Sequence, residues 1–479
     1  MHLQTTQAWI AAGLTALIGL ITYLKCRGQG RGAEGGNKEF FLAGGGLSWV
    51  FVAGSITITN LSTEQLVGMN GNQMALLAWW ELSAVVGLSI LAWVFLPIYY
   101  RHNCTTVTEL LEKKYNNVGI RSMIATIFLV GNVVIYQPIM LYTGALMMKS
   151  MFGLEIPILV LAAAFAVAGS LYAIFGGLRA VAVTDTYSGI LLLAMCMLIV
   201  FLSLQAIGFD FSGIPAERLT MIGGNDSPIP WHTLLTGMLF IQMFYWSTNQ
   251  TITQRAMAAP NLKEAQKGVF AAMVVRLLIV PPMVVIPGIV SYKLFGHLGD
   301  EAYGKIVWHV LPTWMSGIFA AAIASAVLAH FASVLNSSAA LYVCDIHEKY
   351  IQPDPNVPRL SMVVSIGFVV LSLMLVPVYD GADSIINLVQ KLNGLTSMPV
   401  LSVFIVGLLF RNVDPRAAIA GLVFGVALYA IFSFGWAPLH YIHMMFITLW
   451  TTVAFSLALN RWVFGKRAEF IFARKIAVT

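Results

Sequence analysis

Charged residues are scarce in this chain. Asp, Glu, Lys and Arg together make up 10% of its 479 residues, whereas hydrophobic residues make up 58%. A typical soluble domain carries about 25% charged residues. Apolar runs of about 20 residues, the length that crosses the hydrocarbon core of a bilayer as a helix, recur along the whole sequence. The composition therefore excludes a soluble protein and predicts an all-α polytopic membrane protein.

Cysteine is also scarce, and no metal-binding or phosphate-binding motif is present. The four cysteines show neither metal-ligand nor disulfide spacing, so we expect free thiols. The Gly-rich segment 28–46 has no preceding strand and no following Gly-Lys-Ser/Thr, which argues against a phosphate loop. The net charge of +6 comes from basic residues in short loops rather than on one face. We therefore expect a lipid bilayer and a small solute as partners, and no nucleic acid.

Hydropathy and charge together predict the topology. The first apolar segment has no Lys or Arg before it and basic residues after it, which favours a retained span over a secretory signal. Most of the 27 basic residues then fall in inward loops, and only Arg276 and Lys391 lie inside or at the edge of spans. This predicts an outside N-terminus and a cytoplasmic C-terminus in a plasma membrane, most economically a bacterial inner membrane. The thirteen predicted spans are 8–24, 48–70, 76–99, 121–148, 155–176, 181–207, 231–252, 267–292, 313–343, 360–378, 384–410, 416–435 and 441–462.

Polar residues interrupt the second of these spans. The apolar helix that begins at Trp49 meets Thr59, Asn60, Ser62, Thr63, Glu64 and Gln65 within seven positions. Unpaired backbone groups at membrane depth persist only where they line a wet cavity or hold a ligand. The pattern Leu-Ser-Thr-Glu-Gln at 61–65 is echoed by Trp-Ser-Thr-Asn-Gln at 246–250, inside another apolar segment. Two interrupted helices in corresponding positions predict an inverted-repeat transporter with its site between the breaks.

The predicted repeat divides the chain into five parts. Each repeat contains five spans, so the fold is a five-plus-five inverted repeat within about 13 transmembrane helices. The remaining spans are peripheral. The parts are 1–47, a peripheral span and cytoplasmic connector; 48–207, the first repeat; 208–230, an extracytoplasmic loop; 231–411, the second repeat; and 412–479, two peripheral spans and a cytoplasmic tail.

Seven motifs, in order along nearly the whole chain, resemble the sodium:solute symporter family, and most closely its bacterial sodium/sugar branch. The resemblance implies inward movement of a small solute by alternating access, driven by a cation gradient that is usually sodium. The motifs are Phe40-Phe41-Leu42-Ala43-Gly44; Asn60-Leu61-Ser62-Thr63-Glu64-Gln65 with Gly68-Met69; Phe95-Leu96-Pro97; Gly176-Gly177-Leu178 with Thr184-Asp185; Tyr245-Trp246 with Asn249-Gln250 and Gln254-Arg255; Glu264-Ala265-Gln266-Lys267-Gly268; and Ser333-Val334-Leu335-Asn336-Ser337 with Asp345-Ile346.

The same resemblance implies a substrate site. A sugar needs amide and carboxylate partners for its hydroxyls and an apolar platform for its ring. Tyr245 matches the aromatic that stacks on the sugar and forms the inner gate, and Asn60 matches the residue that steadies it. The residues that match the hydroxyl-binding set are Gln65, Glu81, Gln242, Arg276 and Gln390, and those that match the outer gate are Met69, Trp80 and Ile386.

Each of these assignments has a structural alternative. Glu81 and Arg276 could pair only to hold helices together, the glutamines could hydrogen bond between helices, and Tyr245 could simply pack in the core. The sugar branch has Lys where Arg276 stands and Asn where Gln242 stands. Because a guanidinium suits carboxylate, sulfonate or phosphate, an acidic sugar is an open alternative.

The cation site departs from the family pattern. The sodium-binding carbonyls of the family map to Ile58, Leu61 and Ala326, but its two Ser hydroxyls map to Ala329 and His330. An imidazole is a poor ligand for a hard cation. One hypothesis is that a protonated His330 replaces sodium and the protein is proton-coupled. The alternatives are a neutral structural histidine and a sodium site rebuilt from other oxygens, namely those of Ser333, Ser337, Thr184 or Asp185.

Asp185 matches an acidic residue on the cation exit route, or a second sodium site, of some relatives; the alternative is a water-exposed cap.

The sequence as a whole predicts a cation-coupled symporter that imports a sugar or sugar-like solute, with sodium or a proton as coupling ion and no cofactor. An uncoupled permease or solute sensor of the same fold is the rival hypothesis. No nucleophile–base or metal-ligand motif joins the buried polar residues, so we do not expect an enzyme.

Overall fold

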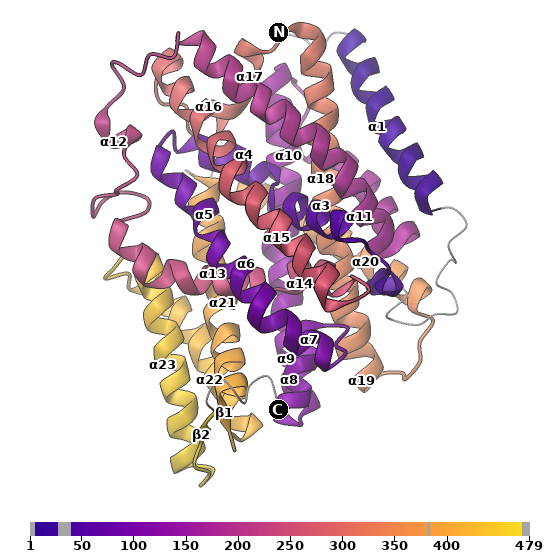
Figure 1. Cartoon of the computed structure of the whole chain (residues 1–479), viewed down its shortest axis with the longest axis vertical. Helices are drawn as coiled ribbons and strands as arrows, with labels where there is room; N and C mark the ends of the chain where they lie inside the picture. Colours follow the sequence, from indigo (N-terminus) through magenta and orange to yellow (C-terminus); the bar gives the residue numbers. More distant parts are fainter. Residues whose placement is uncertain (1–4, 27–39, 381–383, 472–479) are drawn as a thin grey trace.

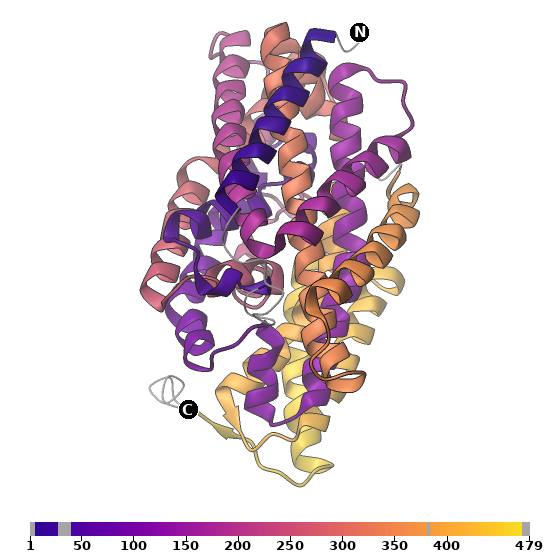
Figure 2. The same cartoon turned by 90° about the vertical axis from the view of Figure 1, so that its right-hand side faces the viewer.

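The structure, a computed structural model, describes residues 5–26, 40–380 and 384–471. It is an elongated bundle of helices, with α1 toward one end and strand β2 toward the other (Figures 1 and 2). The Gly-rich connector predicted at 28–46 falls largely outside the described residues. Cys104, Cys196 and Cys344 are free thiols, whereas the side chain of Cys26 is not described.

The helices of the first half follow one another in chain order. They are α1 (Thr5–Cys26), η1 (Ala43–Gly45), α3 (Trp49–Asn60), α4 (Thr63–Gly71), η2 (Ala75–Ala78), α5 (Trp79–Leu82), α6 (Ala84–Ile90), η3 (Leu91–Phe95), α7 (Leu96–Arg101), α8 (Val107–Tyr115), α9 (Val118–Val130), η4 (Gly131–Tyr136), α10 (Gln137–Phe152), α11 (Ile158–Ala206) and α12 (Ala216–Leu219).

The second half has the same character and ends with a two-stranded antiparallel pair. Its elements are η5 (Trp231–Leu235), α13 (Gly237–Ser247), α14 (Gln250–Met257), α15 (Leu262–Leu278), α16 (Val280–Phe295), η6 (Gly299–Glu301), α17 (Ala302–Val310), α18 (Thr313–Tyr342), η7 (Val343–His347), α19 (Glu348–Tyr350), α20 (Val357–Leu375), η8 (Val376–Tyr379), α21 (Ile385–Leu409), β1 (Phe410–Arg411), α22 (Pro415–Ala430), η9 (Ile431–Gly435), α23 (Tyr441–Trp462) and β2 (Glu469–Phe470).

Among the described residues, nine helical segments are long and apolar enough to cross a membrane, and three shorter apolar helices accompany them. One sequence expectation differs from the structure. The two spans predicted at 155–176 and 181–207 are joined in the single helix α11, without the expected loop. A straight helix of that length would measure roughly 70 Å, more than twice the hydrocarbon thickness. Hydropathy marks apolar stretches, but it does not show whether the backbone between them leaves the helix.

Both predicted interruptions are present. α3 ends at Asn60 and α4 begins at Thr63, with Leu61 and Ser62 outside helical geometry between them. α13 ends at Ser247 and α14 begins at Gln250, and the Asn249 side chain caps α14 by accepting a hydrogen bond from the Thr251 amide at 2.9 Å. Each break leaves helix-terminal backbone groups inside the bundle, as the sequence pattern indicates.

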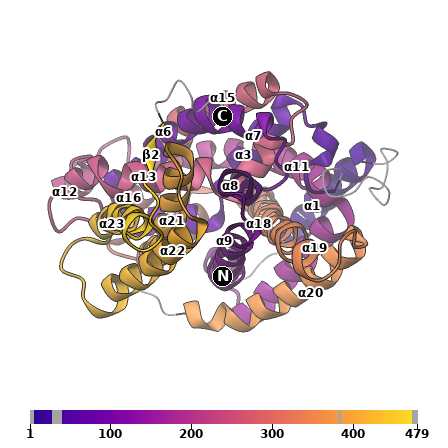
Figure 3. The ribbon, with the colours of Figure 1, turned by 90° about the horizontal axis from the view of Figure 1, so that it is seen from below.

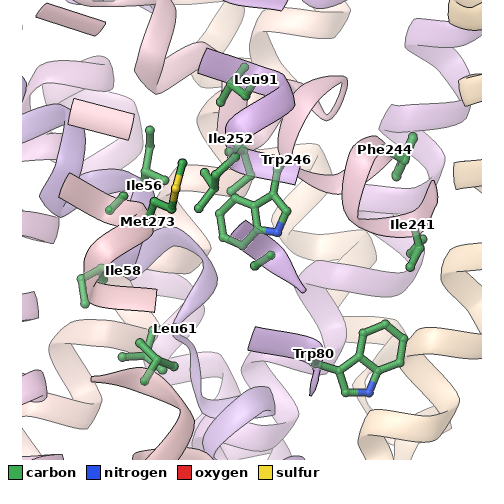
Figure 4. Close-up of a cluster of buried hydrophobic side chains, with 14 of the residues drawn as sticks. Ile56, Ile58, Leu61, Trp80, Leu91, Ile241, Phe244, Trp246, Ile252 and Met273 are labelled. Atoms are coloured by element: carbon green, nitrogen blue, oxygen red, sulfur yellow. The ribbon is translucent and has the colours of Figure 1, made fainter. Parts of the chain in front are cut away.

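The interior is built around α18, whose side chains are almost all buried from Ser316 to Leu341. Seen along the bundle, α18 lies beside α9 and α3, while α20, α22 and α23 lie toward the periphery (Figure 3). An apolar cluster fills the space around the first break and joins it to α13. Figure 4 shows Ile58 and Leu61 of this cluster on one side, and Trp80 and Ile241 on the other. The breaks therefore sit in the packed interior of the bundle.

Candidate functional site

A small polar cavity lies between the two breaks. α3 and α4 contribute three polar side chains, η4 contributes Tyr136, and α13 and α21 supply the facing wall. The free volume is about 50 Å³, smaller than the roughly 300–1,000 Å³ of typical ligand pockets, so the walls must separate to admit a solute. The lining residues are Asn60, Glu64, Gln65, Trp80, Tyr136, Ile241, Gln242, Tyr245, Trp246, Ile386, Val389, Gln390 and Asn393.

Asn60, at the end of α3, connects the break to Tyr245. Placing its amide so that both the oxygen and the nitrogen are satisfied lets Asn60 donate to the Tyr245 hydroxyl at 2.8 Å and accept from Gln65 Nε2 at 3.1 Å. In the same orientation it accepts from Arg276 Nη2 at 3.0 Å. Gln65 Oε1 has no hydrogen-bond partner among the described residues. The predicted contact of Asn60 with Tyr245 is present, and Gln65 retains an acceptor for a solute hydroxyl.

Glu81 and Arg276 form a buried ion pair behind the cavity wall. The carboxylate contacts Arg276 Nη1, and Nη2 donates to the Thr57 carbonyl at 2.8 Å. The guanidinium also lies 4.9 Å from the ring centroid of Trp246. Neither member of the pair lines the cavity, although both were expected in the hydroxyl-binding set. The pair binds α5, α3 and α15 together, so the guanidinium is already neutralised by a carboxylate.

Gln242 lines the cavity, yet its amide is already engaged. Its Nε2 donates to the Trp80 carbonyl at 2.8 Å and to Ser83 Oγ at 2.9 Å, and its Oε1 accepts from Trp246 Nε1 at 2.8 Å. These bonds tie α13 to α5 and fix the indole of Trp246. The geometry therefore matches the alternative of interhelical hydrogen bonding for this glutamine.

Gln390 belongs to a polar group on α21. Its Oε1 accepts from Asn393 Nδ2 at 3.1 Å, and Asn393 Oδ1 accepts from the Tyr136 hydroxyl. Residues three apart on a helix share a face, which places Gln390 and Asn393 together at the cavity. This group spans α21 and η4 and presents amide and hydroxyl groups to a solute.

The residues expected at the outer gate are only partly assembled at the cavity. Trp80 and Ile386 line it, whereas Met69 is fully buried away from the lining. Gly68, one residue before Met69, packs directly on Ile386: a Cβ added at Gly68 would lie 2.8 Å from Ile386 Cβ. α4 and α21 thus approach as closely as their backbones allow.

His330 faces Glu64 across the first break. Nδ1 of His330 lies 3.8 Å from Glu64 Oε1, and both side chains are buried. Neither His330 Nδ1 nor Glu64 Oε2 has a hydrogen-bond partner in the described part of the chain. A buried carboxylate and a buried imidazolium are costly unless the two groups exchange a proton or hold an ion.

The charges around this pair come from several helices. Arg255 of α14 and Arg276 of α15 act on His330 electrostatically, and Tyr136 of η4 is close to Glu64. The guanidiniums oppose a positive charge on the imidazole, whereas the Glu64 carboxylate 3.8 Å away favours it. A positive charge on the imidazole therefore depends on the nearby Glu64 carboxylate.

Asp185 of α11 lies in a second polar group. It accepts from Ser55 Oγ at 2.5 Å and Thr59 Oγ1 at 3.5 Å, and its Oδ1 has no partner among the described residues. Thr59 also accepts from Arg255 Nε at 3.0 Å, so Asp185 and the buried Arg255 are connected through one hydroxyl. Asp185 is fully buried rather than exposed as a cap.

The family's sodium ligand set does not fit these residues. Leu61 lies in the break as expected, and Ile58 and Ala326 are buried, but Ala329 and His330 supply no hydroxyl. Ser337, one of the alternative oxygens, donates to Gln254 Oε1 at 2.9 Å, and Thr184 is engaged with Thr22 at 2.9 Å. Within residues 5–26, 40–380 and 384–471, no group of three or more His, Cys, Asp or Glu residues could hold a metal ion.

Sequence reasoning did not assign Glu64, Tyr136, Asn393 or Arg255 to the site. The sequence could have indicated Glu64, because it lies within the same polar interruption as Gln65. It could also have indicated Asn393, since this residue follows Gln390 by three positions on the same helix. Tyr136 and Arg255 lie on helices whose orientation the sequence does not give.

Comparison with solved structures defines the class of protein to which this fold belongs. The fold matches a structure of a Na+-coupled sialic acid symporter with a TM-score of 0.83 at 17% identity, covering 98% of this chain and 100% of that one. It also matches Mhp1, a nucleobase-cation-symport-1 family transporter, with a TM-score of 0.55 at 14% identity, covering 87% and 92%. The chain therefore has the inverted-repeat transporter fold, as the sequence predicts.

The family model for the sodium:solute symporter family matches residues 40–425, and the chain belongs to this family. It is 32% identical to the uncharacterized symporter YidK of Escherichia coli (strain K12), over 97% of this chain and 85% of that protein. It is 29% identical to the sodium/glucose cotransporter of Vibrio parahaemolyticus, over 88% and 84%, and 26% identical to the mouse sodium/myo-inositol cotransporter 2, over 82% and 65%. The protein is thus a multi-pass membrane transporter and not an enzyme.

Proposed function

We propose that this protein imports a neutral, sugar-like solute with several hydroxyl groups by alternating access, coupled to a cation gradient. The observation that carries the proposal is the composition of the cavity. It combines the amides of Asn60, Gln65, Gln390 and Asn393 with the ring of Tyr245. Amides can replace the hydrogen bonds that hydroxyls lose on leaving water, and an aromatic ring covers the apolar face of a sugar ring.

The ion pair behind the cavity supports a neutral rather than an acidic solute. The named relatives include transporters of glucose and myo-inositol, and the structural match includes a sialic acid symporter. An acidic sugar needs an uncompensated cation, but the Arg276 guanidinium is paired with Glu81 and lies outside the lining. In this proposal Glu81 and Arg276 position Asn60 and Trp246 instead of contacting the solute.

We further propose that the coupling cation is a proton held at His330 with the help of Glu64. The absence of both family hydroxyls, at Ala329 and His330, argues against sodium at this position. A protonated imidazole carries the same charge as the sodium ion it replaces, and the Glu64 carboxylate lies 3.8 Å away to stabilise it. Asp185, with an unpartnered oxygen, would receive the cation on its way to the cytoplasm.

The remaining parts of the proposal concern topology. The N-terminus would lie outside and the C-terminus inside a plasma membrane, with 48–207 and 231–411 as the two repeats. Trp80, Met69 and Ile386 would form the outer gate, and Tyr245 the inner gate. Because the cavity offers only about 50 Å³, both gates must move during each cycle.

Uptake into proteoliposomes tests the proposal. Labelled glucose, galactose and myo-inositol are offered under a sodium gradient, a proton gradient or neither, with wild type and His330→Ala in parallel. We expect accumulation under the proton gradient and its loss in His330→Ala. Sodium-driven accumulation that survives the substitution would overturn the proton assignment. Equilibration without accumulation under every gradient would instead identify an uncoupled permease or sensor.

A further inference from the structure

A second cavity, apolar and much larger than the first, lies on the face of α21 that points away from the solute cavity. We call it the groove. Its volume is about 600 Å³, within the roughly 300–1,000 Å³ range of ligand pockets. Its walls come from α9, η4, η8, α21 and α22, and most of the lining residues are aliphatic. Val130, Val134 and Val378 of this lining are 52%, 37% and 71% exposed, so the cavity opens on the surface that faces the bilayer. Figure 3 shows α9 lying between α20 and α22 on this side of the bundle.

α21 and η4 separate this groove from the solute cavity. On α21, Leu388, Leu392 and Leu395 face the groove while Gln390 and Asn393 face the solute cavity. On η4, Val134 lines the groove and Tyr136 the solute cavity. Any molecule that fills the groove therefore packs on the back of the helices that present amides and hydroxyls to the solute.

One of the two basic residues inside or at the edge of the spans lies beside this groove. Lys391 follows Leu388 by three residues and precedes Leu395 by four, so it shares a helical face with these two leucines. It is half-buried, it forms no ion pair with any described residue, and its Nζ lies 5.9 Å from the ring centroid of Phe434. Lys391 is in the second turn of α21, close to the end of the span, where a long basic side chain reaches the headgroup region.

We propose that this groove is a binding site for one phospholipid of the surrounding bilayer. An acyl chain lies along the three leucines, and the lipid phosphate pairs with Lys391. The exposed valines at the mouth of the groove suit contact with lipid hydrocarbon, and an ammonium without an ion pair beside them complements an anionic headgroup. The bound chain braces α21 in the position that keeps Gln390 and Asn393 at the solute cavity, so solute binding becomes dependent on the lipid.

Native mass spectrometry of the purified full chain tests this directly, with phosphatidylglycerol, phosphatidylcholine and diacylglycerol as probes. We expect one retained phosphatidylglycerol per chain, and weaker retention of the two probes without a net negative charge. Lys391→Gln should weaken phosphatidylglycerol binding about fivefold, the effect of ~1 kcal/mol from one basic residue near anionic lipid, and Lys391→Arg should restore it. Excess glycerol phosphate should not compete, because it lacks the chain.

Two groove-filling variants test the acyl-chain contact. Leu392→Trp acts from α21 and Val378→Trp from η8, so the loss of lipid does not depend on one substitution being tolerated. Leu371→Trp on the exposed face of α20 and Lys305→Gln in α17 are matched controls. Thermal melting reports whether each variant is folded. Retention of lipid at the wild-type level by Lys391→Gln, Leu392→Trp and Val378→Trp would overturn the proposal and show adventitious annular lipid only.

Discussion

His330 Nδ1 and Glu64 Oε1 lie 3.8 Å apart, although 266 residues of chain separate them. Glu64 is on α4, which follows the first break, and His330 is on the central helix α18. Movement of α4 relative to α18 would change the distance between the two groups and therefore their affinity for a proton. In the proposed mechanism, this contact would join proton binding to gate movement at a single point.

Replacing Glu64 by Gln should abolish proton-driven accumulation but leave solute counterflow. The amide keeps the shape and polarity of the side chain but not its charge, so the imidazole loses its balancing carboxylate. Counterflow requires solute binding and alternating access without net proton movement. Both rates are measured in the same proteoliposomes.

Glu264→Gln is the matched control, since Glu264 pairs with Lys267 at the start of α15 rather than near the break. Undiminished accumulation in Glu64→Gln would argue against the proton pair. If the wild type shows no counterflow of the labelled solutes, the proposal that it carries a sugar-like solute is wrong.

Breaking the Glu81–Arg276 pair should destabilise the protein strongly. Arg276→Met leaves a buried carboxylate without its cation, which costs about 3–5 kcal/mol in comparable sites. The double variant Arg276→Met with Glu81→Gln should recover most of this loss, because no uncompensated charge remains. The midpoint of thermal denaturation in detergent measures both effects. Equal destabilisation of the single and double variants would contradict the role of the pair.

A methyl group at Gly68 should hold the outer gate apart. The Cβ of Gly68→Ala would lie 2.8 Å from Ile386 Cβ and 3.1 Å from the Ile386 amide nitrogen, so α4 and α21 must separate. Overpacking of this kind costs about 1–3 kcal/mol. We expect slower transport and faster labelling of a cysteine placed at Gln65 by a reagent added outside.

Gly367→Ala in α20 is the control for that substitution, because a Cβ there meets nothing within 4 Å. If Gly68→Ala transports and labels like the wild type, the closeness of α4 and α21 does not control access.

Asp300 should make stability depend on pH between about 4 and 6. Burial raises the pKa of this carboxyl from 3.8 to about 6, although the Ile385 amide donates to it at 3.0 Å. The folded state therefore holds a proton that the unfolded state has released, and stability falls as pH rises through this window. In the wild type the melting temperature should fall from pH 4 to pH 6 relative to that of Asp300→Asn. Parallel profiles for the two proteins would show that Asp300 does not titrate in this range.

Much of the architecture could be predicted because the physical signal is local. Polar residues at 59–65 and 248–250 cannot lie in a continuous apolar helix without partners, so both breaks follow from the sequence. The partners themselves could not be predicted, because they depend on how distant helices pack. Glu81 and Arg276 were expected at the solute, yet they satisfy each other behind it. Gln242 was expected to bind hydroxyls, yet its amide holds α5 and Trp246.

One face of α21 lines the solute cavity and another lines the apolar groove, and this arrangement has a pharmacological consequence. An apolar compound that dissolves in the bilayer can reach Leu388, Leu392 and Leu395 without passing either gate. Such a compound would change the position of Gln390 and Asn393 from behind. It would therefore lower the maximal rate of transport at any solute concentration, in contrast to a sugar analogue, which excess solute displaces.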